Sequence, residues 1–141
     1  MKQYTGTKVV NAEPMTRQEY NDLRGWQVPD DENPSDDGFL TEDLDGSAPN
    51  TATHTGYVSW TPKDMFEKTY LPSEHPIDRM AIENLQLLER LKALDGLLEK
   101  PQPKFISDKQ WILLQSQRAY MKGYFKVLDE RIEDMAAQAG L

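Results

Sequence analysis

The sequence predicts an α+β protein, in which a small antiparallel β-sheet module with short helices precedes a long antiparallel α-helical hairpin. In the first half, short β-prone stretches are separated by turn dipeptides such as Asp37-Gly38 and Asp45-Gly46, which are typical of tight turns between antiparallel strands. In the second half, apolar residues recur at alternating steps of three and four, the period of packed helices. Leu71-Pro72 marks the boundary, because residues before proline avoid helical angles. We therefore expect a β-rich module over 1–72 and a hairpin over 73–141.

Three strands and two short helices are expected in the first half. Residues 3–12 are β-prone and predict the first strand. Thr16-Arg-Gln-Glu19 is a capping box, which predicts a helix through Leu23 that closes near Gly25. After a polar loop over 29–37, the stretch FLTEDL predicts the second strand, and 56–60 predicts a short aromatic third strand. Thr61-Pro62 then offers an N-cap and a proline at the first helical position, which predicts a helix to about Tyr70.

The hairpin is expected from two apolar seams on either side of a proline-rich turn. The first helix starts after Pro76 and must stop at the segment 100–103, which holds two prolines. Ser107-Asp-Lys-Gln110 is a second capping box and opens the next helix. The first seam comprises Asn84, Leu87, Leu91, Leu94 and Leu98, and the second comprises Trp111, Leu114, Arg118, Met121, Phe125, Leu128, Ile132 and Met135. Two such helices joined by a short turn form an antiparallel hairpin.

Composition and charge limit the partners. The chain of 141 residues carries a net charge of -8, of which residues 1–60 carry -7 and residues 61–141 carry -1. A strongly acidic protein repels a nucleic-acid polymer, whereas a small anion can still be held by a few positioned arginines. The sequence contains no cysteine and no apolar run long enough to span a bilayer. We expect a cytoplasmic protein with no membrane partner and no nucleic-acid polymer as partner.

The reactive side chains do not suggest a catalytic site. His54 and His75 both lie in expected loops, outside any metal-binding or nucleophile–base spacing, and are read as exposed loop histidines. The acidic pairs Asp30-Asp31 and Asp36-Asp37 lie in a loop and are read as solvated charge. No glycine-rich phosphate loop is present. We therefore expect no catalytic residue, no metal and no cofactor, in a protein that binds rather than reacts.

Two polar residues interrupt the apolar seams. Asn84 and Arg118 take positions otherwise filled by Leu, Trp or Met, and burying them costs free energy unless they find partners. If the hairpin folds about Pro103, Arg118 lies level with Glu89 on the facing helix. Either Arg118 forms an ion pair that fixes the register, or its guanidinium points into an intersubunit cavity and binds a phosphate or a base. Phe105 lies in the interhelical loop, where its ring must cover a neighbour or a ligand.

The second helix carries a spaced set of residues that runs from Leu114 through Gln117, Met121, Tyr124 and Leu128 to Glu130, Arg131 and Ile132. This set resembles the hairpin shared by phage proteins that sequester bacterial immune signals, the Thoeris anti-defence and anti-CBASS cyclic-nucleotide sponges. The first helix fits the same pattern through Arg79, Glu83 and the leucines to Leu94, but Pro76 stands where the pattern usually has a histidine. The resemblance covers residues 76–134. In the first half, Gly6-Thr-Lys8, Arg24-Gly-Trp26 and the stretch from Gly56 to Lys63 resemble a β-rich module common in phage proteins.

The resemblance implies a non-catalytic protein of the host bacterial cytoplasm. Such sponges assemble as homo-oligomers, often trimers of dimers, and trap a cyclic ADP-ribose isomer or cyclic oligonucleotides at subunit interfaces. Arginine suits the phosphates and an aromatic ring suits the base. Gln117, Tyr124 and Arg131 lie on the matched positions, and Arg24, Phe105 and Arg118 are added as ligand-binding candidates by chemistry and position. The alternatives are a phage structural or adaptor protein that uses the hairpin to oligomerise and, third, a hydrolase of the signal.

Overall fold

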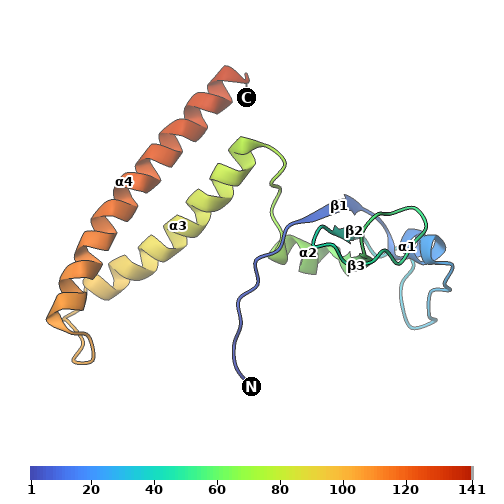
Figure 1. The fold of residues 1–141 in the computed structure, drawn as a ribbon, viewed down its shortest axis with the longest axis horizontal. Helices are drawn as coiled ribbons and strands as arrows, with labels where there is room; N and C mark the ends of the chain where they lie inside the picture. The colour runs from blue at the N-terminus through green and yellow to red at the C-terminus, as the bar shows by residue number, and fades with distance from the viewer. Residues whose placement is uncertain (141) are drawn as a thin grey trace. The chain divides into compact units, whose positions relative to one another are not determined.

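The computed structural model describes residues 1–140 and confirms the predicted α+β class. A three-stranded antiparallel sheet with two short helices is followed by two long helices, coloured yellow-green and orange-red in Figure 1. The chain forms two compact units, Met1–Tyr70 and Leu71–Leu141. Each unit has its own apolar core.

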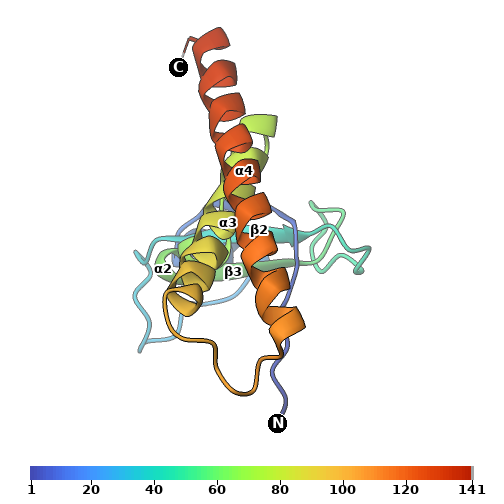
Figure 2. The same ribbon diagram turned by 90° about the vertical axis from the view of Figure 1, so that its left-hand side faces the viewer.

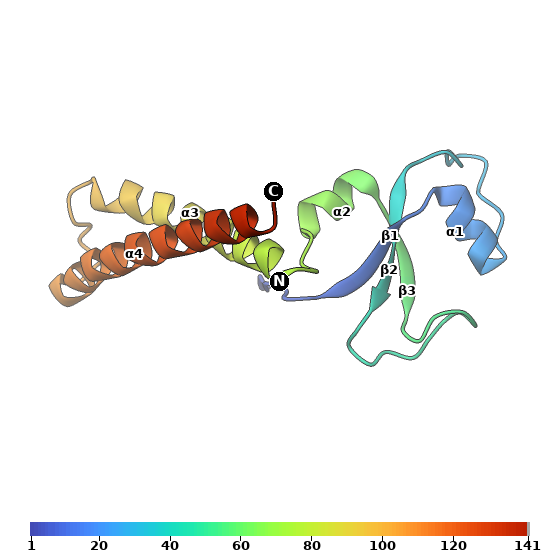
Figure 3. The ribbon, with the colours of Figure 1, turned by 90° about the horizontal axis from the view of Figure 1, so that it is seen from above.

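The sheet of the first unit is a meander with its second strand in the centre. β1 (Val10–Pro14), β2 (Gly38–Asp43) and β3 (Val58–Pro62) lie in the order β1-β2-β3, one below the other in Figure 1. Figure 3 shows the same strands from above, where they overlap. Both neighbours pair with β2 in antiparallel register, with Leu40 opposite Glu13 on one side and opposite Trp60 on the other. Only β2 has strand partners on both edges, and its burial is correspondingly the highest of the three.

The first strand is shorter than predicted. We expected residues 3–12, but β1 begins at Val10 and ends at Pro14. Val10 pairs with Asp43, the last residue of β2, so residues before Val10 have no strand to pair with. A β-prone sequence forms a strand only where a neighbouring strand supplies hydrogen bonds. The length of β2 therefore sets the start of β1.

Helix α1 (Arg17–Arg24) has the predicted termini. Thr16 accepts a hydrogen bond from the Glu19 N–H at 3.2 Å, and the Glu19 carboxylate accepts one from the Thr16 N–H at 3.3 Å. Gly25 closes the helix with φ 70°, a left-handed conformation that glycine adopts readily. The helix buries Tyr20 against Leu40 and Val58, and these three residues form the core of the first unit.

A prediction at the N-terminal cap tests this description of α1. Thr16→Ala removes the side-chain acceptor, and we expect the first unit to lose about 0.5–2 kcal/mol of unfolding free energy. Chemical denaturation followed by circular dichroism measures the loss. Thr7→Ala is the matched control, because Thr7 is exposed and lies outside any helix or strand. Equal unfolding curves for both variants would contradict the capping role of Thr16.

The end of the first unit differs from the prediction in two details. β3 covers Val58–Pro62 rather than 56–60, because its pairing extends to Gly38 at the start of β2. Thr61 was expected to cap the following helix, and this was wrong. It lies in β3 opposite Phe39, and α2 (Lys63–Thr69) starts after Pro62 without a side-chain cap. The Lys63 N–H instead donates to the Asp37 carbonyl at 3.0 Å, so a contact with the turn before β2 replaces the expected cap.

The second unit is the predicted hairpin of α3 (Pro76–Leu98) and α4 (Asp108–Gln138). The two helices run side by side in Figures 1 and 2, and α4 continues past the first residues of α3. The α3 seam is confirmed, with Asn84, Leu87, Leu91 and Leu94 buried. On α4 the buried residue is Leu128, and Met121, Phe125, Ile132 and Met135 pack around it half-buried.

The predicted capping box of α4 is formed only in part. Ser107 accepts from the Gln110 N–H at 3.2 Å, as expected. The box also requires the Gln110 side chain to bond the Ser107 N–H, and no such bond is present among residues 1–140. At this end of the loop, Gln102 donates from Nε2 to the Ile106 carbonyl and to the Asp108 carboxylate, each at 2.9 Å. Gln102 thus holds the turn in place across the start of α4.

Candidate functional site

One side of α4 carries three of the candidate residues together. With about 3.6 residues per helical turn, Gln117, Tyr124 and Arg131 recur on the same side of the helix. Gln117 and Tyr124 border a shallow hollow of about 520 Å³, which is lined by Leu113, Ser116, Gln117, Tyr120, Met121 and Tyr124. All six residues belong to α4, so the hollow is an open surface along one helix. We call this surface, together with Arg131, the α4 face.

The α4 face exposes aromatic rings, which is unusual for large apolar groups. Tyr120 is 80% exposed and Tyr124 is 46% exposed. Leu113 and Val127 on the same side are about half exposed. Rings in this setting offer flat apolar surface for stacking.

Tyr124 is fixed by a contact with the facing helix. Its hydroxyl donates a hydrogen bond to the carboxylate of Glu83 on α3. This hydrogen bond, with partial desolvation and the negative charge of Glu83, raises the pKa of Tyr124, while the positive charge of Arg131 opposes the increase. The hydroxyl is therefore protonated at neutral pH and holds the ring at a defined position.

Gln117 and Arg131 keep polar groups at the two ends of this surface. The Gln117 amide lies 3.7 Å from the Met121 sulfur, a weak contact that leaves its other hydrogen-bonding positions open to a ligand. Arg131 is exposed, and none of the ion pairs within residues 1–140 includes it. An amide, two phenol rings and a guanidinium therefore follow one another along the helix.

Arg118 has a different partner from the one predicted. We expected Glu89, but the Arg118 Nη1 lies 3.8 Å from Oδ1 of Asp95, which is also 3.9 Å from the Lys122 ammonium. Side chains on a helix point toward its N-terminus, which for α4 is the end at the interhelical loop. The Arg118 side chain therefore reaches Asp95, which is closer to this loop than Glu89 is. Arg118 thus pairs with a carboxylate on the facing helix, as in the first alternative, but the partner is Asp95 instead of Glu89. The other polar seam residue, Asn84, is 8% exposed, and its Oδ1 has no hydrogen-bond partner within residues 1–140.

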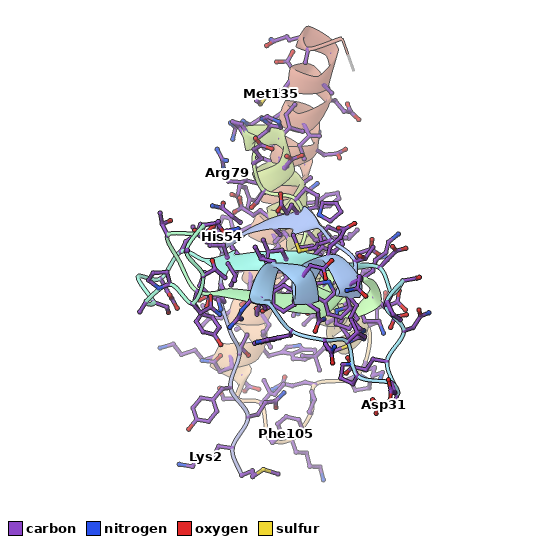
Figure 4. All side chains as sticks on the ribbon, turned by 90° about the vertical axis from the view of Figure 1, so that its right-hand side faces the viewer. Lys2, Asp31, His54, Arg79, Phe105 and Met135 are labelled. Carbon is purple, nitrogen blue, oxygen red and sulfur yellow. The ribbon has the colours of Figure 1, made fainter. Side chains whose placement is uncertain are left out.

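Phe105 and Arg24 lie away from the α4 face. Phe105 is 88% exposed and projects from the loop between α3 and α4, where Figure 4 labels it. Its ring therefore lies largely in solvent. Arg24 belongs to the first unit, where its guanidinium lies 4.2 Å from the centre of the Trp26 ring and donates to the Tyr20 hydroxyl at 2.9 Å. The structure thus brings together Gln117, Tyr124 and Arg131 but not the other three candidates.

Sequence reasoning missed Tyr120 and Leu113 as parts of this surface. A signal was present, because Leu113, Gln117, Tyr120, Tyr124, Val127 and Arg131 repeat at steps of four and three. This second stripe runs beside the first seam and has the same period.

The other reactive groups are dispersed among residues 1–140. His54 lies in a loop as expected but is half-buried instead of exposed, because its Nδ1 lies 3.0 Å from the hydroxyls of Thr51 and Thr53. His75 precedes α3, and its N–H donates to Asp78 at 3.2 Å. In this part of the chain no three His, Cys, Asp or Glu side chains are grouped to hold a metal ion. Within the described residues, no helix combines the length and apolarity needed to cross a membrane.

The hairpin with this face is also where a comparison with known proteins succeeds. Residues 74–134 match the Sequestin family model. The Sequestin segment covers all of α3 and most of α4, and it includes Glu83, Gln117, Tyr124 and Arg131. The sheet unit lies outside the Sequestin segment. No curated protein and no solved structure matches the chain.

Proposed function

We propose that the protein is a phage anti-defence sponge. It binds cyclic nucleotide immune signals, either cyclic ADP-ribose isomers or cyclic oligonucleotides, and sequesters them in the host bacterial cytoplasm without cleaving them. The observation that carries the proposal is the α4 face, where an amide, exposed phenol rings and an unpaired arginine lie along one helix. The name of the family model that matches the hairpin supports a sequestering role.

The chemistry of the α4 face suits a phosphate–ribose–base ligand. The exposed ring of Tyr120 or Tyr124 stacks on a base, and the Arg131 guanidinium binds a phosphate through two parallel donors. The Gln117 amide forms hydrogen bonds with a ribose hydroxyl or with the edge of a base. The net charge of -8 is no obstacle, because a small anion responds to the few groups that touch it.

Self-association completes the site in this proposal. The hollow on α4 is open and formed by one helix, so a single hairpin offers a ligand only one wall. α4 has 31 residues but fully buries only Leu128 within the hairpin. Exposed apolar side chains of this number favour burial against another copy. We propose a homodimer or a higher oligomer in which a second copy supplies the other wall and Phe105 or Arg118 reaches the ligand from it.

A measurement of mass tests the assembly. We expect light scattering at micromolar concentration to give at least twice the chain mass of 16.2 kDa. Tyr120→Glu places a charge in the middle of the exposed stripe, and we expect it to lower the mass toward that of one chain. Glu130→Gln is the control, because Glu130 is exposed on another side of α4. A monomer for the unaltered chain would reject the proposed assembly.

A binding experiment separates a sponge from an enzyme and from an adaptor. The protein is incubated with a cyclic ADP-ribose isomer or a cyclic oligonucleotide, freed of unbound ligand and then heated. We expect the ligand to be released intact, and to be released equally by the His54→Ala/His75→Ala variant. Cleavage products would favour a hydrolase. Failure to retain any of these nucleotides, with the oligomer intact, would favour the phage structural or adaptor protein, which the exposed apolar stripe of α4 also suits.

A further inference from the structure

A second hollow lies in the first unit, beside α1. It has a volume of about 330 Å³, and we call it the Trp26 hollow. Its lining combines two indole rings and a phenol with a proline, two amides and one ion pair. These residues are Arg17, Tyr20, Asn21, Trp26, Gln27, Pro29, Glu32 and Trp60. None of them belongs to the α4 face, and the proposed function does not use this hollow.

The Trp26 ring is held firmly although water reaches it. Gly25 turns the chain at the end of α1, and the backbone N–H of Trp26 donates to the Asn21 carbonyl at 2.8 Å. The ring meets Tyr20 edge-to-face at 6.0 Å between centroids, and the Arg24 guanidinium lies 4.2 Å from its centre. The residue nevertheless remains 52% exposed. A rigid, exposed indole is the kind of side chain that anchors protein–protein contacts.

The charges around the hollow favour a cationic occupant. Arg17 packs over the Trp60 ring at 4.5 Å and bonds both Glu32, at 3.0 Å, and Asp36, at 3.2 Å. The loop over 29–37 carries five carboxylates, which outnumber the two guanidiniums beside the hollow, those of Arg17 and Arg24. The carboxylates of Glu32 and Asp36 are about 40% exposed. Asp30 and Asp31 lie in the same loop, where Figure 4 labels Asp31. The local charge therefore disfavours a phosphate and favours a lysine or arginine.

The uncharged lining favours proline. Grooves that recognise proline-rich segments are lined by aromatic rings, against which the flat pyrrolidine ring packs. Such segments are extended before they bind, so they lose little conformational entropy. Indole N–H and amide groups, as in Trp26 and Gln27, can donate to the carbonyls of an extended segment. Together, the lining and the charges fit a short basic segment that contains proline.

The chain itself contains such a segment in the hairpin loop. Lys100-Pro101-Gln102-Pro103-Lys104 places two prolines between two lysines. Both lysines and Pro101 are exposed, and Pro103 is half-buried. The exposed Gln102 side chain donates hydrogen bonds to the Ile106 carbonyl and the Asp108 carboxylate, which tie the loop to the start of α4 while the lysines stay in solvent.

We propose that the Trp26 hollow of one copy docks the Lys100–Lys104 loop of a second copy. Proline packs against Trp26, and the lysines approach Glu32 and Asp36. The first 60 residues carry a charge of -7, which attracts this basic loop at long range. The contact gives the sheet unit a role in assembly that is separate from the ligand chemistry of α4.

A peptide titration tests the contact. The receptor is the full chain with Lys100→Glu and Lys104→Glu, so that its own loop does not compete. The probe is a capped peptide with the sequence of residues 100–104. Nuclear magnetic resonance follows the indole N–H signals of the three tryptophans. We expect the Trp26 and Trp60 signals to move and the signal of Trp111, on α4, to stay. Trp26→Ala in the same receptor should weaken binding by at least about 5-fold, the effect of losing an anchor residue.

Two control peptides and one assembly measurement make the test decisive. A peptide with alanine for both prolines, and one with glutamate for both lysines, should bind more weakly. In sedimentation experiments, Lys100→Glu/Lys104→Glu should weaken self-association, whereas Lys109→Glu/Lys126→Glu, which makes the same change of charge elsewhere, should do so less. Equal binding of the alanine peptide, equal movement of the Trp111 signal, or equal self-association of the two charge variants would overturn the proposal.

Discussion

Arg131→Ala lowers the affinity for the sequestered nucleotide on the order of 10- to 150-fold if the proposed function is correct. The expected size follows from removing a charged hydrogen bond to a phosphate in a partly desolvated site, which costs about 1.5–3 kcal/mol. Arg131 lies about two helical turns after Tyr124 on α4, and its charge opposes the increase in the pKa of Tyr124. Arg131→Lys should restore only part of the affinity, because an ammonium cannot offer two parallel donors. Calorimetric titration with the released ligand measures both effects.

A second cation on the same helix serves as the control for Arg131. Lys126 is exposed on another side of α4, so Lys126→Ala removes the same formal charge without touching the α4 face. We expect its affinity to equal that of the unaltered chain. Thermal melts of both variants should differ little, since exposed ion pairs contribute about 0–1 kcal/mol. Equal affinities for Arg131→Ala, Arg131→Lys and the unaltered chain would remove Arg131 from the site.

Leu128→Ala is expected to have the largest effect on stability. Leu128 is 2% exposed and packs with Met80 and Leu87 in the core of the hairpin. Removing a buried leucine side chain costs about 2–5 kcal/mol, because a cavity remains after the transfer free energy is lost. Chemical denaturation followed by the helical circular dichroism signal measures the change in unfolding free energy.

An exposed leucine on the facing helix provides the comparison for Leu128. Leu85 lies on α3 with 48% of its surface exposed, and Leu85→Ala deletes the same atoms. We expect this variant to lose well under half of the stability that Leu128→Ala loses. Similar losses at both positions would mean that Leu128 is not the centre of the core, and the packing of α3 against α4 would need revision.

Local signals predicted most of the fold correctly. The Thr16 capping box, the closing Gly25 and the seam through Leu87 and Leu91 all lie where the sequence placed them. These features depend on residues that are close in the sequence, so a short segment contains the whole reason for them. The errors came where a distant segment decides, as in the late start of β1, which depends on the length of β2. Thr61 also has a good capping sequence, but pairing with Phe39 keeps it in the sheet.

The candidate site was also predictable only in those features that depend on local sequence. The spacing of Gln117, Tyr124 and Arg131 was sufficient to place them on one side of a helix. It could not show that Tyr124 bonds Glu83, because that contact depends on how the two helices are aligned by the loop. Nor could it give the partner of Arg118, since the lean of a long side chain along the helix directs it to Asp95 instead of the level residue Glu89.

The sequence by itself determined the class of the fold, the order of its elements and the apolar seams of the hairpin, because these follow from periodicity and from local caps and turns. Only the tertiary structure decided which polar groups from distant parts of the chain meet. Contacts such as Tyr124 with Glu83 on the hairpin, and Arg17 with Glu32 in the first unit, join residues that are distant along the chain. Their formation depends on helix alignment, strand register and side-chain direction, which are properties of the packed chain and not of any short segment.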